Sequence, residues 1–289
     1  MRNFDEHNIT DEVVAKVGQG DNPRVRQISQ SLVRHLHDFI RDVEPSFEEW
    51  EAAIRFLTET GAMCSDTRQE FILLSDTLGA SMLVDAINHR LAGNATETTV
   101  LGPFYVDNPP ALELGSDISG DHEGTPMLVR GSVASSTGEP LAGAVVDTWH
   151  SDDEGYYDVQ HYDQGGGVSL RARFRTDADG RFRFWSIVPK YYPIPDDGPV
   201  GRMLRQQGRH PYRPAHVHFM IGAPGHEKLV THVFVAGDEY IDSDVVFGVK
   251  DSLIRELSHH PAGTAPDGRT LESDYAILDY DFVLSPKPA

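Results

Sequence analysis

The segment RPAHVHF, residues 213–219, places His216 and His218 one residue apart. On a β-strand, side chains two residues apart point to the same face, whereas on a helix they diverge by roughly 200°. The surrounding AHVHFMIG is rich in β-branched and aromatic residues and predicts a strand. His35 and His37 have the same spacing within a helical pattern, so their rings should not converge. Two same-face histidines can begin a metal site, which then needs further ligands.

Several residues elsewhere could complete such a site. The candidates are His150, His161, His232, the acidic residues of HSDDEGYYD, and the tyrosines Tyr156, Tyr157, Tyr191 and Tyr192. A phenol has an ordinary pKa of about 10, so a tyrosine ligand requires a cation that holds the phenolate at neutral pH. Trivalent iron suits this role better than zinc does. Adjacent residues on an extended segment face opposite ways, so at most one tyrosine of each pair should enter a given site. Each of these side chains could instead serve packing or hydrogen bonding within a sheet.

The composition is that of a globular protein. The chain has 289 residues, of which 39% are apolar and 24% charged, and it can bury a sizeable core. With 45 acidic and 25 basic residues, the net charge of -20 argues against nucleic acid or an anionic membrane as partner. The single cysteine, Cys64, excludes an intrachain disulfide framework and fits a reducing compartment. No apolar signal segment or stretch of about 18 apolar residues is found, so we expect no membrane insertion and a cytoplasmic protein.

The hydrophobic pattern changes period near residue 110. From Asn22 to about Asn94 the spacing is helical. The first predicted helix carries Val25, Ile28, Leu32, Leu36, Phe39, Ile40 and Val43 and ends at Pro45, and the next two start at the capping boxes Ser46–Glu49 and Asp66–Gln69, the last running through Leu83. Beyond LGPFYVDNPP, short strand patterns separated by Gly, Pro and Asp predict an antiparallel β-sandwich. We therefore expect an α+β protein with a helical domain at 1–110 and a sandwich domain at 111–289.

Three strand predictions can be stated sharply. Residues 173–187 predict a hairpin with its turn at Asp177 to Gly180. The last stretch, YAILDYDFVL, predicts one closing strand. The proline-rich residues 188–216 predict a long functional loop that delivers the chain to His216.

Three motifs together resemble a known family. DTWHSDDEGYYD (147–158), SIVPKYYPIPDDGP (186–199) and RPAHVHFMIGAPGHEKLVTH (213–232) look like the iron-site segments of the intradiol ring-cleaving catechol dioxygenases. The resemblance extends through EFILLSDTLGASMLVDAINH and TVLGPFYV, so it covers most of the chain. Three segments in the family's order are far more specific than two neighbouring histidines.

The resemblance implies one non-haem Fe(III) per chain. Its ligands would be Tyr157, Tyr192, His216 and His218 with a solvent ligand, which makes Tyr156 and Tyr191 neighbours only. By the same resemblance, Tyr192 takes up a substrate proton. Arg213 stabilises negative charge that develops on the substrate ring. The implied reaction opens the ring of a vicinal diol with dioxygen and needs no external reductant.

Other positions resemble the hydroxyquinol branch of the family. YPIPDDGPVG, LVTHVFV and DSDVVFGVKDSL point to benzene-1,2,4-triol as substrate and 3-hydroxy-cis,cis-muconate, the enol form of maleylacetate, as product. His232 stands where simple catechol enzymes usually have glutamine, and Asp76 would accept a hydrogen bond from the extra hydroxyl. Leu101 departs from the aromatic residue expected there. The implied pocket residues are Leu73, Asp76, Val100, Leu101, Gly102, Pro103, Phe104, Ile194, Pro195, Arg213, His232 and Val246.

The resemblance further implies a homodimer through the N-terminal helices, and it suggests a phospholipid between them. Three alternatives stay open on the residues alone. The first is a catechol or chlorocatechol 1,2-dioxygenase with the same iron. The second is a zinc hydrolase that uses His216, His218 and a carboxylate of SDDEG. The third is a sandwich module without catalytic activity that binds small ligands.

Overall fold

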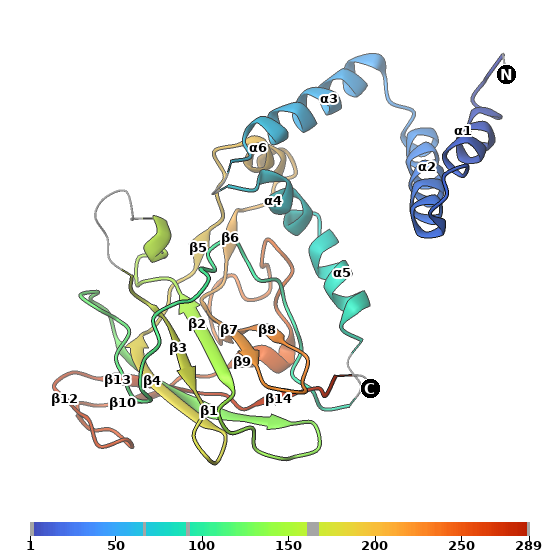
Figure 1. The fold of residues 1–289 in the computed structure, drawn as a ribbon. Coiled ribbons are helices and arrows are strands. Elements are labelled where there is room, and N and C mark those ends of the chain that lie inside the picture. Colours follow the sequence, from blue (N-terminus) through green and yellow to red (C-terminus); the bar gives the residue numbers. More distant parts are fainter. Residues whose placement is uncertain (1–2, 66–67, 91–92, 161–167, 288–289) are drawn as a thin grey trace. The chain divides into compact units, whose positions relative to one another are not determined.

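The chain divides into two compact units in a computed structural model. The structure describes residues 3–65, 68–90, 93–160 and 168–287. Residues Met1–Glu59 form one compact unit and residues Thr60–Ala289 form the other, and Figure 1 labels their helices and strands. The predicted helical domain at 1–110 and sandwich domain at 111–289 were divided by function instead, and that division stays a prediction.

The first unit is helical, as predicted. It holds α1 (Ile9–Val17), α2 (Pro23–Val43) and most of α3 (Phe47–Ala62). Helix α2 ends before Pro45, at a residue in the left-handed conformation. The capping box of α3 is present, because Ser46 donates its backbone N–H to Glu49 at 2.8 Å and Glu49 donates its own to the Ser46 hydroxyl at 3.2 Å.

The third predicted helix is two helices. Helices α4 (Glu70–Thr77) and α5 (Ala80–Asn88) are separated by Gly79, whose φ of 71° a helix interior does not allow. The prediction of one helix through Leu83 was therefore wrong. The sequence did not reveal the break, since the apolar spacing continues across it. Asp66, the predicted cap, lies outside the described residues.

The second unit is a β-sandwich of two mixed sheets. One sheet has the order β10-β13-β1-β14 with β4 also paired to β1, and the other has the order β3-β2-β7-β8-β9. Their strands are β1 (Pro126–Ser135), β2 (Val145–His150), β3 (Arg171–Arg175), β4 (Arg181–Ile187), β7 (His216–Gly222), β8 (Leu229–Val235), β9 (Ile254–Arg255), β10 (Ser258–His260), β13 (Tyr275–Asp279) and β14 (Phe282–Leu284). The shorter elements are β5 (Tyr192–Pro193), β6 (Tyr212–Arg213), β11 (Gly263–Thr264), β12 (Thr270–Leu271), η1 (Asp158–Gln160) and η3 (Asp251–Leu253). The predicted fold class is confirmed with one correction: β1 pairs in parallel with β13 and β14, and β8 with β9, so the sandwich is not purely antiparallel.

The predicted hairpin at 173–187 is a link between the two sheets. Its turn is where the sequence placed it, with the Gly180 N–H donating to the Asp177 carbonyl at 3.0 Å. However, β3 pairs with β2 whereas β4 pairs with β1. Phe174 and Phe184 stack between the layers with ring centroids 5.0 Å apart. An alternating pattern cannot distinguish two strands paired in one sheet from two strands that face each other across the core, because both arrangements bury every second side chain.

The closing stretch of the chain also differs from its prediction. Strands β13 and β14 replace the single strand, and the Tyr280 N–H between them donates to the Arg130 carbonyl at 3.0 Å. The Asp281 carboxylate accepts from the Ser132 backbone N–H and hydroxyl at 2.8 and 2.7 Å. Between β13 and β14, Asp281 thus contacts β1 through its side chain.

The proline-rich loop is ordered by its own short elements. It contains helix α6 (Pro199–Gln206), which the sequence did not predict, and the pair β5–β6, in which Tyr192 is the partner of Arg213. The fully buried Glu70 of α4 accepts the backbone N–H of Val200 at 3.2 Å, in the first turn of α6, and pairs with Arg68 at 2.8 Å. This contact fixes the loop against α4.

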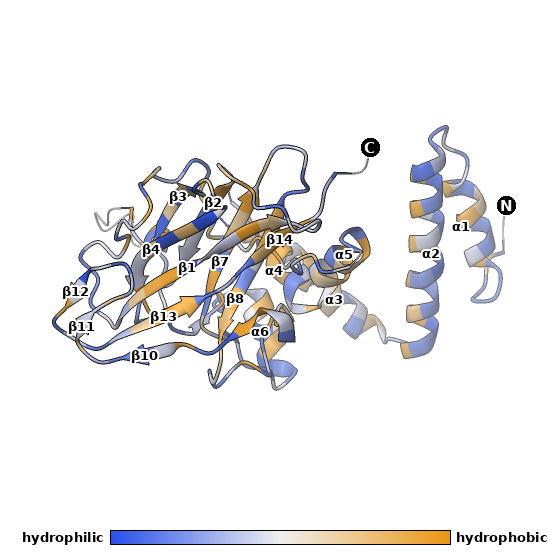
Figure 2. Ribbon diagram, turned by 90° about the horizontal axis from the view of Figure 1, so that it is seen from below, coloured by the Kyte–Doolittle hydropathy of each residue, from blue (hydrophilic) through white to orange (hydrophobic). Residues whose placement is uncertain are grey.

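The main core lies between the two sheets. It includes Val129, Val146, Phe184, Val217 and Phe282, all almost fully buried. Figure 2 shows hydrophobic residues along β8 and bands of alternating hydropathy along α2. In the described part of the chain, no helix has the length and apolar character needed to cross a membrane.

Candidate active site

Four side chains from three segments converge inside the second unit. The Tyr157 hydroxyl lies 3.0 Å from His218 Nε2 and 3.5 Å from His216 Nε2, and the two histidine atoms lie 3.1 Å apart. The Tyr192 ring meets that of Tyr157 edge to face, with the ring centroids 5.1 Å apart, and lies 5.6 Å from that of His216. All four residues are at most 2% exposed. The structure thus brings together the four residues that the resemblance selected.

The β-strands determine where these side chains point. His216 and His218 lie on β7 and share one face, as the spacing predicted, with Trp149 of β2 stacked on His218 at 4.6 Å. Tyr157 follows β2 and precedes η1. Gly155, with φ of 94°, allows the Tyr157 segment to approach β5, because a Cβ there would lie 2.7 Å from the Tyr191 carbonyl.

One tyrosine of each adjacent pair points inward, as expected for extended segments. Tyr157 is 1% exposed, whereas Tyr156 is 45% exposed. Tyr192 is buried, whereas the half-buried Tyr191 packs on the ring of Tyr240 at 4.9 Å. Of these four tyrosines, Tyr157 and Tyr192 are therefore the two that reach the buried cluster.

The local environment favours neutral imidazoles. His216 Nδ1 donates to the Pro214 carbonyl at 2.6 Å, which leaves the Nε2 lone pair free to bind a metal. Burial lowers the pKa of His216 to about 3, aided by the positive charge of Arg213. Burial likewise lowers the pKa of His218 well below its ordinary value, with a contribution from His232. Both rings are thus uncharged at neutral pH and available as ligands.

The tyrosines need a cation to become ligands. Burial raises the pKa of Tyr157 well above its ordinary value, and the nearby Tyr192 raises it further. Two phenols and two imidazole nitrogens converge in a water-excluded place, which fits a hard, highly charged cation that binds phenolate. The donor set therefore fits ferric iron.

A cationic residue and a third histidine border the cluster. Arg213 Nη1 lies 3.4 Å from His216 Nε2, and Arg213 Nη2 lies 3.4 Å from His232 Nδ1. His232 faces His218 across the β7–β8 ladder, with ring centroids 4.2 Å apart. The His232 ring is fully buried, and this burial lowers its pKa well below the ordinary value.

The zinc alternative requires a carboxylate that the structure does not supply. In the described residues, the histidine, cysteine and acidic side chains that gather as possible metal ligands are His216, His218 and His232, within 4.8 Å of one another. Asp152 of the SDDEG motif instead accepts the backbone N–H groups of Glu154 and Tyr156 at 2.9 and 2.8 Å. A site of two histidines and one carboxylate is therefore not formed.

Part of the predicted pocket forms a buried apolar cluster. Leu73, Ile194 and Val246 belong to it, with Val100 packed against it. Phe104 stacks on Tyr157 at 4.4 Å, and Gly102 approaches His218 so closely that a Cβ would lie 3.2 Å from its ring. Asp76 is 6% exposed, and burial raises the pKa of its carboxyl. Leu101 and Pro103 are exposed and Pro195 is half-buried, so these three lie outside the buried cluster.

His150 and His161 were also candidate metal ligands. Both ring nitrogens of His150 are engaged, with the Ser151 carbonyl and the Ser186 hydroxyl, each at 2.6 Å, so His150 is not a free ligand. His161 lies outside the described residues.

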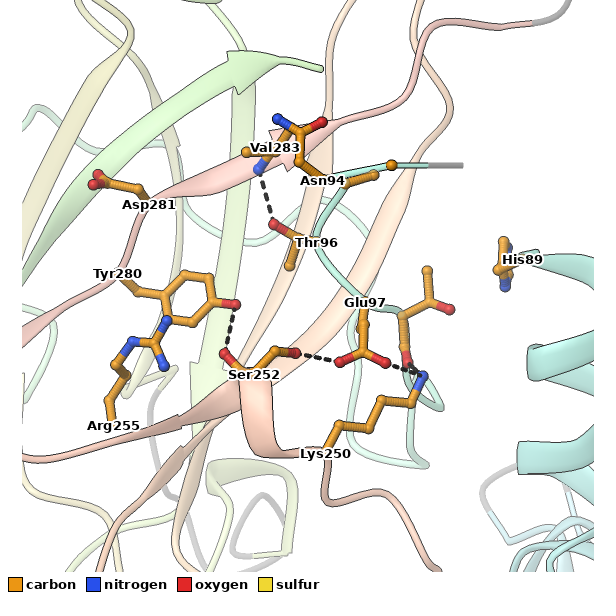
Figure 3. A pocket seen from close by; sticks show the side chains of 13 residues that line it. His89, Asn94, Thr96, Glu97, Lys250, Ser252, Arg255, Tyr280, Asp281 and Val283 are labelled. Atoms are coloured by element: carbon orange, nitrogen blue, oxygen red, sulfur yellow. Dashed lines mark hydrogen bonds and ion pairs between the residues drawn. The ribbon is translucent and has the colours of Figure 1, made fainter. Parts of the chain in front are cut away.

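A separate surface cavity of about 640 Å³ lies away from the tyrosine–histidine cluster (Figure 3). Glu97, Lys250 and Ser252 line it, and they bond to one another or to nearby backbone. Tyr280 also lines it and donates to the Ser252 carbonyl at 3.1 Å. Because these polar groups already have partners within the cavity wall, it does not present the convergent chemistry of the buried cluster.

Sequence reasoning missed the residues that hold the cluster in place. Asp244 binds Arg213, and the buried pair Asp158–Arg171 lies directly beside Tyr157. Asp244 lies 31 residues from Arg213 in the chain, and Asp158 lies 13 residues from Arg171, so no local pattern connects the members of either pair. The one available signal was that Asp244 lies in DSDVVFGVKDSL, a segment already noted for its resemblance.

Taken together, the fold and the site define a two-unit protein whose mixed β-sandwich encloses a tyrosine–histidine centre suited to a metal ion. Comparison with known proteins identifies the family. Residues 22–96 match the model described as catechol dioxygenase N terminus, and residues 100–286 match the model described as dioxygenase.

Similar proteins span the whole chain. A 6-chlorohydroxyquinol 1,2-dioxygenase of Cupriavidus pinatubonensis is 50% identical, covering 99% of both chains. A hydroxyquinol 1,2-dioxygenase of Nocardioides simplex is 46% identical, over 97% of this chain and 96% of that one. The solved structure of hydroxyquinol 1,2-dioxygenase from Pseudomonas putida matches with a TM-score of 0.92 at 50% identity, covering 98% and 99% of the two chains. The chain belongs to the intradiol ring-cleaving dioxygenase family.

Proposed function

We propose that this enzyme cleaves hydroxyquinol with dioxygen, giving 3-hydroxy-cis,cis-muconate, and that it uses one non-haem Fe(III) per chain. The observation that carries the proposal is the convergence of Tyr157, Tyr192, His216 and His218 in one buried cluster. Relatives at 46–50% identity that are named for hydroxyquinol or its chlorinated analogue support the choice of substrate.

The four clustered side chains would hold the iron. When bound, ferric iron would supply a Lewis-acidic centre that accepts electron density from a substrate diolate. Tyr192 would take up one substrate proton at its phenolate oxygen, because its ring lies within the cluster, 5.1 Å from that of Tyr157 and 5.6 Å from that of His216. Arg213 would offset the negative charge that develops on the ring, since its guanidinium is buried beside His216.

The surrounding residues would select and orient the substrate. Leu73, Ile194 and Val246 offer apolar contacts to the ring, and Phe104 covers the Tyr157 side. Asp76 would accept a hydrogen bond from the third hydroxyl, which catechol lacks. Burial of Asp76 favours this interaction, because the carboxyl has little contact with water and the third hydroxyl would supply a further hydrogen-bond donor.

We also propose a homodimer through the N-terminal helices, with a bound phospholipid between them, and a cytoplasmic location. The dimer is supported by one face of α2, where Val25, Ile28, Leu32, Leu36 and Phe39 are 49–63% exposed. Sedimentation of the wild type as a dimer and of Leu32→Glu as a monomer would support this assembly, whereas a wild-type monomer would contradict it.

The cytoplasmic location is supported by the single cysteine, Cys64.

Metal analysis with a visible spectrum tests the iron centre. We expect about one iron per chain and a red to purple colour from tyrosinate bound to Fe(III). Tyr157→Phe should lose most of the colour and iron, whereas Tyr156→Phe, its exposed neighbour, should keep both. A colourless zinc protein would contradict the proposal.

A steady-state comparison tests the substrate. We expect kcat/KM for hydroxyquinol to exceed that for catechol. The opposite order would favour a catechol 1,2-dioxygenase, the name of relatives that are 36% and 32% identical to this chain.

A further inference from the structure

Asp244 binds Arg213 deep inside the second unit. Arg213 Nε donates to Asp244 Oδ1 at 3.0 Å, and Nη2 donates to Oδ2 at 3.1 Å. The two side chains are 3% and 2% exposed. Such a two-point contact fixes the plane of the guanidinium as well as its position.

The carboxylate is itself held by the backbone that follows it. The N–H groups of Val246 and Gly248 donate to Asp244 at 3.3 and 2.9 Å. A Cβ on Gly248 would lie 3.0 Å from Arg213 Nη2 and 3.1 Å from Asp244 Oδ2. Residues 244–248 therefore wrap closely around the ion pair, and they also carry Val246 of the apolar cluster.

This arrangement leaves one edge of the guanidinium for the site. Because Nε and Nη2 are taken by Asp244, Nη1 is the nitrogen that faces the ligand cluster, 3.4 Å from His216 Nε2. Burial opposes ionisation of Asp244, but Arg213 outweighs it and lowers the pKa of the carboxyl. The pair is thus ionised and keeps its geometry at neutral pH.

We propose that Asp244 is a positioning residue for ring cleavage: it aims the Nη1 edge of Arg213 at the place where substrate charge develops, without touching the substrate. This inference rests on the proposed function. An arginine held in advance needs no reorganisation during the reaction, so loss of Asp244 should act on the transition state more than on substrate binding.

Three single variants test the proposal. Asp244→Asn should lower kcat per bound iron by about 10- to 100-fold with little change in KM. Asp242→Asn is the matched control, because it makes the same change at an exposed position of the same segment and should stay within about twofold of wild type. Gly248→Ala keeps both charges but requires the guanidinium to shift by a few tenths of an ångström, and should lower kcat by about three- to tenfold. Unchanged kcat per iron in both Asp244→Asn and Gly248→Ala would overturn the proposal.

Coupling to Arg213 separates positioning from general stabilisation. In an Arg213→Ala background, adding Asp244→Asn should lower kcat no further, since Asp244 acts through Arg213. An equal loss in both backgrounds would overturn the proposal.

A second readout needs neither iron nor turnover. In metal-free protein, the ¹⁵N NMR signal of Arg213 Nε–H should exchange slowly with water, and it should exchange rapidly in Asp244→Asn. Rapid exchange in the wild type would show that the guanidinium is not held, which would also overturn the proposal. Absence of hydroxyquinol turnover by wild type and Asp242→Asn alike would instead overturn the proposed function, and the role of Asp244 with it.

Discussion

The ion pair beside Tyr157 gives the sharpest prediction about stability. Arg171 Nε donates to Asp158 Oδ2 at 2.7 Å, Nη2 bonds to Oδ1, and Nη1 donates to the Phe104 carbonyl at 2.9 Å. Both side chains are at most 2% exposed. One guanidinium thus connects Asp158, next to Tyr157, to the backbone of Phe104, whose ring stacks on Tyr157.

We predict that Arg171→Met lowers the free energy of unfolding by about 3 kcal/mol. Removal of one partner from a buried ion pair typically costs about 3–5 kcal/mol. The lower end applies because Asp158 still accepts backbone N–H groups from Val159 at 2.8 Å and Ser169 at 3.4 Å. Displacement of the adjacent Tyr157 should also reduce iron content.

Urea unfolding at pH 7 measures the effect. Arg175→Met is the control, since Arg175 is exposed at the other end of the same strand and should cost less than about 1 kcal/mol. Adding Asp158→Asn to Arg171→Met should recover part of the loss, because no buried charge then lacks its partner. A cost below about 1 kcal/mol for Arg171→Met, or full additivity in the double variant, would refute this reasoning.

Two further predictions concern specificity and pH. Asp76→Leu should lower kcat/KM for hydroxyquinol by about 10- to 100-fold, the value of a charged hydrogen bond, and should change kcat/KM for catechol by less than about threefold. Equal losses for both substrates in steady-state assays would exclude a hydrogen bond from Asp76 to the third hydroxyl. Burial lowers the pKa of His150 to about 4, so the unfolded chain gains a proton below pH 6.5 that the folded chain does not. Between pH 7.5 and 5, wild type should therefore lose about 2 kcal/mol of unfolding free energy more than His150→Gln in urea titrations, and parallel curves would show that His150 does not titrate this way.

The local patterns of the sequence predicted much of the fold and the inward-facing residues. Helix α2 ends before Pro45 as predicted, and the period-two geometry of strands correctly separated Tyr157 from its exposed neighbour Tyr156. These features depend on backbone preferences over a few residues, which a single sequence displays directly.

What the sequence could not predict depends on contacts between distant segments. Strands β3 and β4 look like a hairpin because the turn and the alternation are local features. The sheet that each strand joins depends on its partner, which is β2 for β3 and β1 for β4. Asp244 is one acidic residue among 45, and only the folded chain shows that it faces Arg213. Helix α6 is held at its first turn by Glu70, 130 residues earlier, so its proline-rich sequence alone indicated a loop.

The most direct test of the account is the product formed from hydroxyquinol by the purified protein. With no reductant added, we predict that one dioxygen is consumed per hydroxyquinol and that the product is a ring-opened diacid heavier than the substrate by one O₂. Oxygen uptake and mass spectrometry measure both, with the Tyr157→Phe variant, which we expect to lose both signals, as control. A quinone formed by loss of two hydrogens, with hydrogen peroxide released and the ring intact, would contradict intradiol cleavage of hydroxyquinol by this enzyme.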